Sequence, residues 1–244
     1  MAGSATAGGA TMAGAAEPPA SRARCWVCGN RPADDARHPE AATGGPAAPE
    51  PPSLLPAFMQ CLCGECGDPA LQPYDAAWGR LSAYLHEHWG DIAARGSFDL
   101  SKPFHGEAAA VALNVHLFFV KVLGCKLFSE AIQVNLTPFA TALRCRLPHP
   151  DVTLLVANTE VRSGQWLFHD SSVSVLRSGD EVYSAMWTFL AHPVAIKICY
   201  LKSGAPVREP DGFPWHPMRQ RKIVKLSPYK AETQPLVARR DLRI

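Results

Sequence analysis

Two short cysteine segments place the strongest constraint on how this chain can fold. Each follows the pattern Cys-x-x-Cys-Gly, once at residues 25–29 and again at residues 63–67. Such a turn brings two thiolates together, and the glycine after the second cysteine permits a tight backbone turn. Four soft ligands are the number that a tetrahedral metal site requires. The pattern therefore predicts one metal site with the ligands Cys25, Cys28, Cys63 and Cys66.

The two segments resemble zinc knuckles of the treble-clef or zinc-ribbon type, a resemblance too generic to indicate a particular family. It implies a bound Zn²⁺, and a site of four thiolates leaves no coordination position open for water or substrate. The expected role of the zinc is therefore structural. A helical pattern follows the second knuckle, which favours the treble-clef arrangement. A disulfide or a redox pair is the alternative for either Cys-x-x-Cys.

A biased stretch separates the two knuckles. Residues 31–56 contain seven prolines and few aliphatic side chains, which predicts a flexible, partly polyproline-II insertion. Closing a longer loop costs only about 0.6 kcal/mol per doubling of its length, whereas zinc binding contributes on the order of 10 kcal/mol. The insertion is therefore compatible with a shared site. Cys61 is a fifth candidate ligand, but only Cys63 and Cys66 reproduce the turn, so we interpret Cys61 as a spare thiol.

The remaining chain predicts an α+β domain, because helical patterns come first and strand patterns follow. Expected helices cover residues 74–94, 104–130 and 138–146, the last with Thr137 as N-cap. Expected strands cover residues 152–161, 165–169, 173–176 and 194–201, whereas 181–191 fits a strand or a short helix. The predicted organisation is a disordered tail (1–24), a zinc module (25–70), the α+β domain (71–205) and a basic tail (206–244).

Composition sets further limits. The apolar fraction of 47% fits a globular protein, and the net charge of +2 does not indicate a partner by itself. No signal-peptide pattern and no run of 18 apolar residues is visible, so we expect no membrane partner. A cytoplasmic protein with reduced thiols is the resulting prediction. Oligomeric state is left open by the sequence.

Basic residues gather near the C-terminus, with Trp215 and Tyr229 among them. Such a segment can follow nucleic-acid phosphates while its aromatic rings stack on bases. A solvated terminus that only aids solubility is the alternative. The candidate nucleic-acid-binding residues are Arg219, Arg221, Lys222, Lys225 and Lys230.

Enzyme motifs are weak in this chain. His105-Gly106-Glu107 resembles the His-x-Glu of zinc-dependent cytidine deaminases, but the downstream Pro-Cys-x-x-Cys that this family requires is missing. We therefore expect a non-enzymatic binding or adaptor protein that engages nucleic acid or another protein. Two alternatives stay open: a structural subunit of a larger assembly, and an enzyme with its site in the α+β domain. The polar candidates for that enzyme site are His105, Glu107, His149 and His169.

Overall fold

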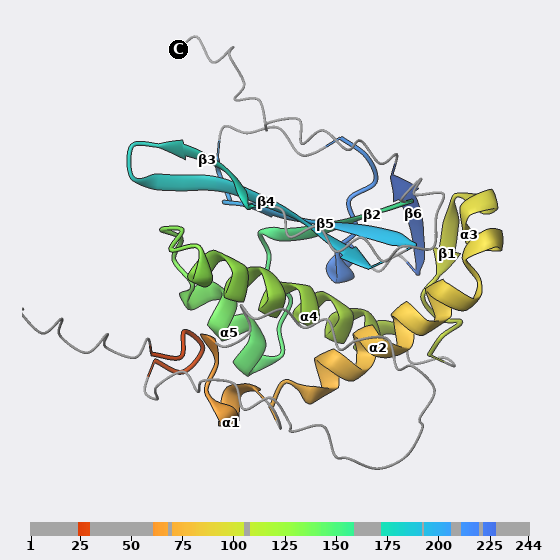
Figure 1. Cartoon of the computed structure of the whole chain (residues 1–244), viewed down its shortest axis with the longest axis horizontal. Coiled ribbons are helices and arrows are strands. Elements are labelled where there is room, and N and C mark those ends of the chain that lie inside the picture. Colours follow the sequence, from red (N-terminus) through yellow and green to blue (C-terminus); the bar gives the residue numbers. More distant parts are fainter. Residues whose placement is uncertain are drawn as a thin grey trace, which may run out of the picture.

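The computed structural model shows a helical layer packed against one face of a mixed sheet (Figure 1). The structure describes residues 24–29, 61–67, 70–104, 108–158, 172–191, 193–205, 211–219 and 222–227. Within these residues the predicted α+β class is confirmed. The predicted disordered tail, the insertion at 31–56 and the expected strand at 165–169 lie outside the described part of the chain.

Six described strands form one sheet in the order β1-β6-β2-β5-β4-β3. Neighbouring strands pair antiparallel except β2 and β6, which run parallel. The strand predicted over residues 194–201 is observed as the central strand β5. Residues 181–191, which fitted a strand or a short helix, form strand β4. Gly179, at φ +58, lies in the predicted turn between β3 and β4. The strands are β1 (Ser97–Asp99), β2 (Val152–Asn158), β3 (Ser174–Ser178), β4 (Glu181–Ala191), β5 (Val194–Leu201) and β6 (Ile223–Ser227).

The helical layer consists mainly of α2 (Gln72–Glu87), α4 (Ala108–Ser129) and α5 (Thr137–Cys145). The predicted helix over 74–94 is divided at His88, after which α3 (Trp89–Arg95) leads to the edge strand β1. Thr137 is not the N-cap of α5, because Leu136 occupies that position without a side-chain cap. Asn135 Oδ1 accepts a hydrogen bond from the Thr137 N–H at 3.0 Å instead. A single turn, α1 (Gly64–Gly67), lies at the second knuckle.

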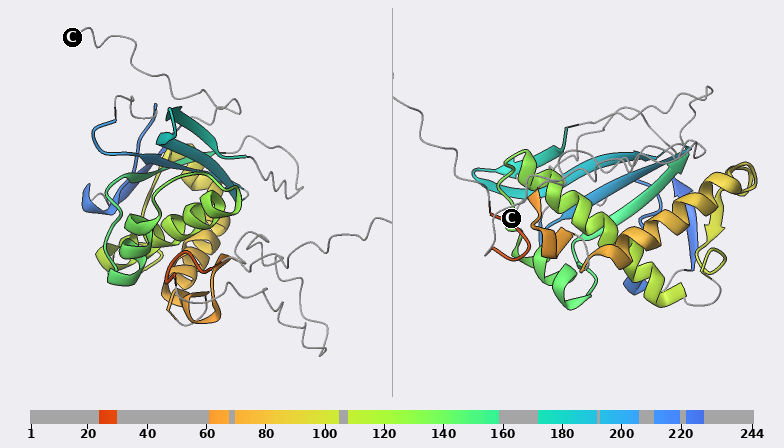
Figure 2. Two further views of the ribbon diagram at one scale, coloured as in Figure 1. Left: turned by 90° about the vertical axis from the view of Figure 1, so that its left-hand side faces the viewer. Right: turned by 60° about the horizontal axis from the view of Figure 1, so that its bottom comes forward.

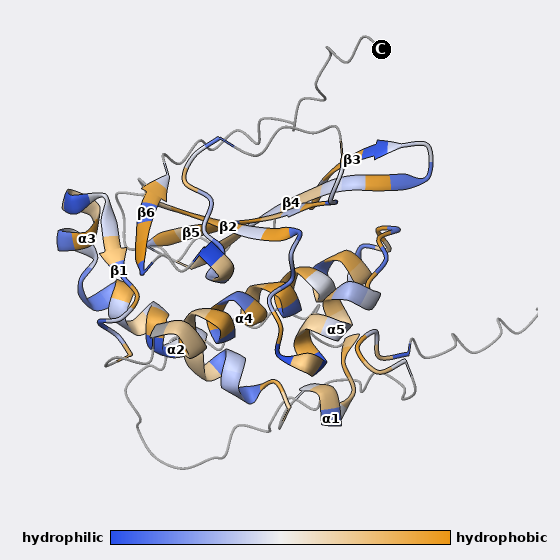
Figure 3. Cartoon of the chain, turned by 180° about the vertical axis from the view of Figure 1, so that it is seen from behind, coloured by the Kyte–Doolittle hydropathy of each residue, from blue (hydrophilic) through white to orange (hydrophobic). Residues whose placement is uncertain are grey.

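Helix α4 is the centre of the core. Its middle and C-terminal side chains are almost all buried, and apolar residues occur on all its sides, as a central helix requires. The stretch Ala109–Ser129 is also long and apolar enough to cross a membrane, but 78% of its 18-residue apolar window is buried inside the domain. Core packing therefore accounts for its composition. Figure 3 shows the apolar colour along the central helices and strands, whereas α3 and the tip of the β3–β4 hairpin are among the hydrophilic parts.

Part of the segment predicted as a basic tail pairs with the sheet. Strand β6 pairs with β1 on one side and with β2 on the other, and Trp215 exchanges two backbone hydrogen bonds with Leu154 at 2.7 and 3.0 Å. The described residues 222–227 therefore extend the sheet beyond the predicted boundary at residue 205. The physical reason is that Val224 and Trp215 bury apolar surface, which stabilises a segment that also contains the charged residues Arg219, Lys222 and Lys225.

Candidate metal centre

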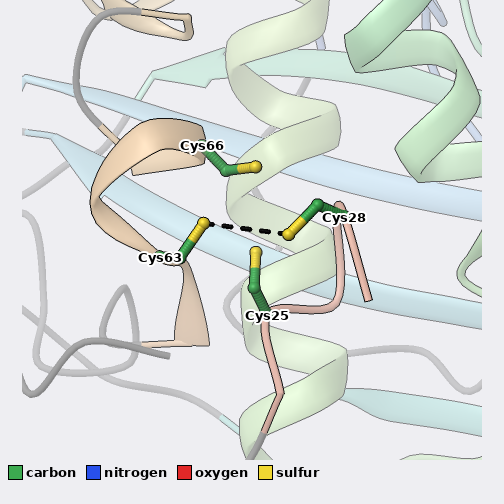
Figure 4. A group of neighbouring side chains, drawn as sticks. All are labelled: Cys25, Cys28, Cys63 and Cys66. Atoms are coloured by element: carbon green, nitrogen blue, oxygen red, sulfur yellow. Dashed lines mark hydrogen bonds between the residues drawn. The ribbon is translucent and has the colours of Figure 1, made fainter. Parts of the chain in front are cut away.

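The four predicted cysteines meet at one point, and we call this group the cysteine centre. Their sulfur atoms all lie within 4.8 Å of one another, although the two knuckles are far apart in the sequence. Figure 4 shows the four side chains directed toward one another, two from each segment. Figures 1 and 2 place both segments beside the helical layer, on the side away from the sheet. The described part of the chain contains no other group of three or more potential metal ligands of this kind.

Both knuckles use the same backbone turn. The N–H of Gly29 donates to the carbonyl of Cys25 at 2.8 Å, and the N–H of Gly67 donates to that of Cys63 at 2.7 Å. Gly29 adopts φ +71, a conformation that glycine reaches without strain. Gly67 has no positive φ, so only the first knuckle requires glycine for its backbone conformation. The turns place two thiols per segment on the side facing the other segment.

The sulfur spacing fits a tetrahedral metal. With metal–sulfur bonds of about 2.3 Å, as in zinc sites, a tetrahedron separates its sulfurs by about 3.8 Å. The Sγ atoms of Cys28 and Cys63 lie 3.8 Å apart, and all four thiols are free of disulfides. The four cysteines can therefore hold a metal ion without a large rearrangement.

The electrostatics of the cysteine centre also favour a cation. Cys25 and Cys63 are buried, and Cys28 and Cys66 are half-buried. Burial, followed by hydrogen bonds and charge repulsion from the neighbouring cysteines, raises the pKa of the Cys66 thiol well above its usual value. Burial likewise raises the pKa of Cys25. Several thiolates can coexist in so small a volume only when a positive ion compensates their charge, so the group is suited to a bound metal.

A tryptophan in the first knuckle docks the cysteine centre onto α4. The ring of Trp26 lies over Gly124, so closely that a Cβ atom added at Gly124 would be 2.5 Å from the ring. Its Nε1–H donates to Cys61 Sγ at 3.2 Å and to Cys125 Sγ at 3.4 Å. Cys61 therefore faces α4 and not the cysteine centre. This placement agrees with its interpretation as a thiol outside the ligand set.

The candidate nucleic-acid residues are only partly described. Arg219, Lys222 and Lys225 are exposed, whereas Arg221 and Lys230 lie outside the described residues. Lys225 Nζ is 5.1 Å from the centre of the Phe213 ring, which is 45% exposed. Hydrogen bonds from Ser101 lower the pKa of nearby Asp99, with smaller contributions from Lys222 and Lys102. We refer to Lys225 and Phe213 together as the basic surface.

Three histidines meet in the core at a different part of α4, and we call them the histidine cluster: His116, His149 and His216. The backbone N–H of His149 donates to His116 Nε2 at 3.2 Å, and His216 Nε2 lies 3.0 Å from the carbonyl oxygen of His149. Burial is the main cause that lowers the pKa of all three, with the pKa of His149 at about 4. The cluster is therefore a neutral hydrogen-bonded group.

The proposed enzyme site is not assembled by the described residues. Of its four candidates only His149 is described. Its backbone bonds to His116 and His216, and its ring Nδ1 accepts a hydrogen bond from the N–H of Asp151. His105, Glu107 and His169 lie outside the described part of the chain. The sequence patterns did not indicate Trp26 or His216, because Trp26 occupies a variable position of its Cys-x-x-Cys motif and His216 belongs to no motif. A tryptophan between two metal-binding cysteines is the signal that could have drawn attention to Trp26.

No known protein family matches this chain. The curated proteins contain no match to it, and neither do the solved structures.

Proposed function

We propose that the cysteine centre binds one Zn²⁺ as a structural ion and that the protein is a non-enzymatic binding module. The observation that carries this proposal is the convergence of the four sulfurs within 4.8 Å. Four thiolates saturate a tetrahedral zinc ion, so no position is left for a reacting water. The ion would join the first knuckle to the second and hold both against α4. Zinc is preferred because soft thiolate ligands in a tetrahedron suit it well.

Metal analysis of the purified protein tests this first part. We expect one zinc per chain in the wild type, and loss of that zinc in both Cys25→Ser and Cys66→Ser. Cys145→Ser is the matched control, because Cys145 is exposed and lies outside the cysteine centre. A wild-type protein without bound metal, or a Cys66→Ser variant that keeps its zinc, would contradict a shared four-thiolate site.

The binding role that we infer for the module is recognition of single-stranded nucleic acid. Support comes from the basic surface, where the exposed Lys225 lies beside a half-exposed aromatic ring, and Arg219 and Lys222 are further exposed basic residues of the same C-terminal region. Cations neutralise phosphates, and an accessible phenyl ring can stack on an unpaired base. Lys225 is near the Phe213 ring, so a phosphate and a base of one strand could be bound together. A protein partner is the alternative outcome of the same test.

Titration of a labelled 20-nucleotide single strand by fluorescence anisotropy tests this second part. We expect binding that weakens as salt is raised, and that is reduced several-fold in Lys225→Gln and in Phe213→Ala. Arg177→Gln is the control, because it removes one exposed positive charge from strand β3, at the opposite edge of the sheet from β1. Absence of affinity at low salt, or affinity that ignores both variants and salt, would refute a nucleic-acid role and favour a protein partner.

A further inference from the structure

A second pair of thiols lies beside the cysteine centre without belonging to it. Cys61 precedes the second knuckle and Cys125 is part of α4, and both are buried. One donor, the Nε1–H of Trp26, contacts both sulfurs, at 3.2 Å and 3.4 Å. Two thiols from distant parts of the chain are thus held together in the core.

This pair has too few ligands for a zinc site of its own. A structural zinc requires four ligands, and the only potential metal group of three or more ligands among the described residues is the cysteine centre. The chemistry open to two adjoining thiols is that of a dithiol. Two cysteines in contact can form a disulfide when an oxidant is supplied.

We propose that Cys61 and Cys125 form a reversible disulfide when the protein reacts with hydrogen peroxide. In the first step one thiol is oxidised to a sulfenic acid while the O–O bond of the peroxide breaks and one water leaves. In the second step the other thiol attacks that sulfur, the S–S bond forms and a second water leaves. Two S–H bonds are lost, two electrons pass from sulfur to peroxide oxygen, and a dithiol reductant reverses the change.

The position of the pair gives the bond a defined consequence. Cys61 lies two residues before the ligand Cys63, and Cys125 lies next to Gly124, on which Trp26 packs. The disulfide would therefore attach the second knuckle covalently to the central helix. Because a crosslink between distant residues restricts the unfolded chain, the oxidised protein is expected to unfold at a higher temperature. The four zinc ligands are not consumed by this reaction.

The test treats the zinc-loaded full chain with a small excess of hydrogen peroxide and maps its cysteines by mass spectrometry under non-reducing conditions. Trypsin is expected to yield a fragment of residues 122–126, which contains Cys125, and a fragment of residues 38–80, which contains Cys61. We expect these two fragments to be linked, and fragmentation of the linked species to place the bond at Cys61. The intact chain should lose two hydrogens and keep its zinc.

Three controls make the outcome decisive. Cys61→Ser and Cys125→Ser should each abolish the linked species, whereas Cys145→Ser should form it as the wild type does. The mapping of the wild type decides the question even where a core variant fails to fold. Release of zinc with oxidation of Cys25, Cys28, Cys63 or Cys66 while Cys61 and Cys125 remain available to an alkylating reagent would overturn the proposal. So would the absence of any linked species.

Discussion

The cysteine centre and the histidine cluster join distant segments to the same helix by opposite electrostatic means. Near Gly124 the cysteine centre is held against α4 through Trp26, and at His116 the helix contacts His149 and His216. The thiols suit a cation because several negative charges in one place require compensation. The histidines avoid that need by staying neutral, since burial lowers the pKa of each.

The comparison shows how each contact depends on solution conditions. A group of thiolates that is held together by a metal ion is disrupted when a chelator removes that ion. A neutral histidine group is instead insensitive to chelators and sensitive to acid. The two regions should therefore respond to different treatments, and each treatment can be applied while the other region is monitored.

Metal removal should have the largest effect. Structural zinc sites contribute on the order of 10 kcal/mol, which is comparable to the stability of a whole domain. We expect a strong chelator, or the variant Cys66→Ser, to release residues 24–29 from α4 and to expose Trp26 to solvent. Limited proteolysis with mass analysis measures that release. Cys145→Ser should behave as the wild type, and a chelated protein that keeps its protease resistance would show that the docking does not need metal.

The sequence predicted the cysteine centre but not the histidine cluster, because the two groups differ in how far apart their residues lie along the chain. Within each knuckle the ligands are three residues apart and share one turn, so the spacing itself carries the chemistry. The histidines of the cluster lie 33 and 67 residues apart along the chain. Only the packing of α4, the segment before β2 and the segment after Trp215 brings them together.

The strands also show that local sequence patterns predict an element better than they predict contacts between distant segments. Strand β5 has a long run of β-branched and aromatic residues and was predicted within its observed bounds, Val194–Leu201. Strand β6 has only five residues and stands among charged side chains, so its local pattern resembled a tail. Its assignment depends on non-local pairing with β1 and β2. The parallel pairing of β2 with β6 has no local sequence signal at all.

Acid should have the second-largest effect, and it should act on the histidine cluster. Histidine has a pKa near 6.5 in the unfolded chain, and burial lowers it in the folded chain, to about 4 for His149. Between these values the unfolded state binds more protons. This contribution to stability is therefore complete above pH 6.5 and is lost as pH falls toward 4, by at most about 1.4 kcal/mol per pH unit for each histidine.

The acid response has a measurable signature. Burial lowers the pKa of His216, with a small further decrease from Arg219, whereas Asp151 raises that of His149 and so opposes burial. We expect the free energy of unfolding in urea to fall between pH 7.5 and 5.5, and His149→Gln to reduce this fall. His86→Gln removes an exposed histidine and is the control. Zinc content is measured at each pH, and an equal fall in both variants would refute the role of the cluster.

Gly124→Ala should lower the free energy of unfolding by a smaller amount, and it tests the contact between Trp26 and α4 directly. The added Cβ would lie 2.5 Å from the Trp26 ring, so the ring or the knuckle that carries it must shift. Overpacking of this kind costs about 1–3 kcal/mol, offset in part by the better helix propensity of alanine. Gly79→Ala in α2 meets no atom within 4 Å and should be neutral or slightly stabilising. Urea unfolding of both variants measures the difference, and equal stabilities would mean that Trp26 does not pack on Gly124.

The smallest effect concerns the indole N–H that joins the first knuckle to the thiols of Cys61 and Cys125. Trp26→Phe keeps an aromatic ring but removes the donor, which should cost about 1 kcal/mol of unfolding free energy. The ring change alone also alters packing, so a double-mutant cycle with Cys125→Ala is required to isolate the hydrogen bond. A hydrogen bond between the two side chains predicts that the double variant loses less than the two single variants together. Strict additivity would assign the docking of the knuckle to packing and metal binding, and not to this donor.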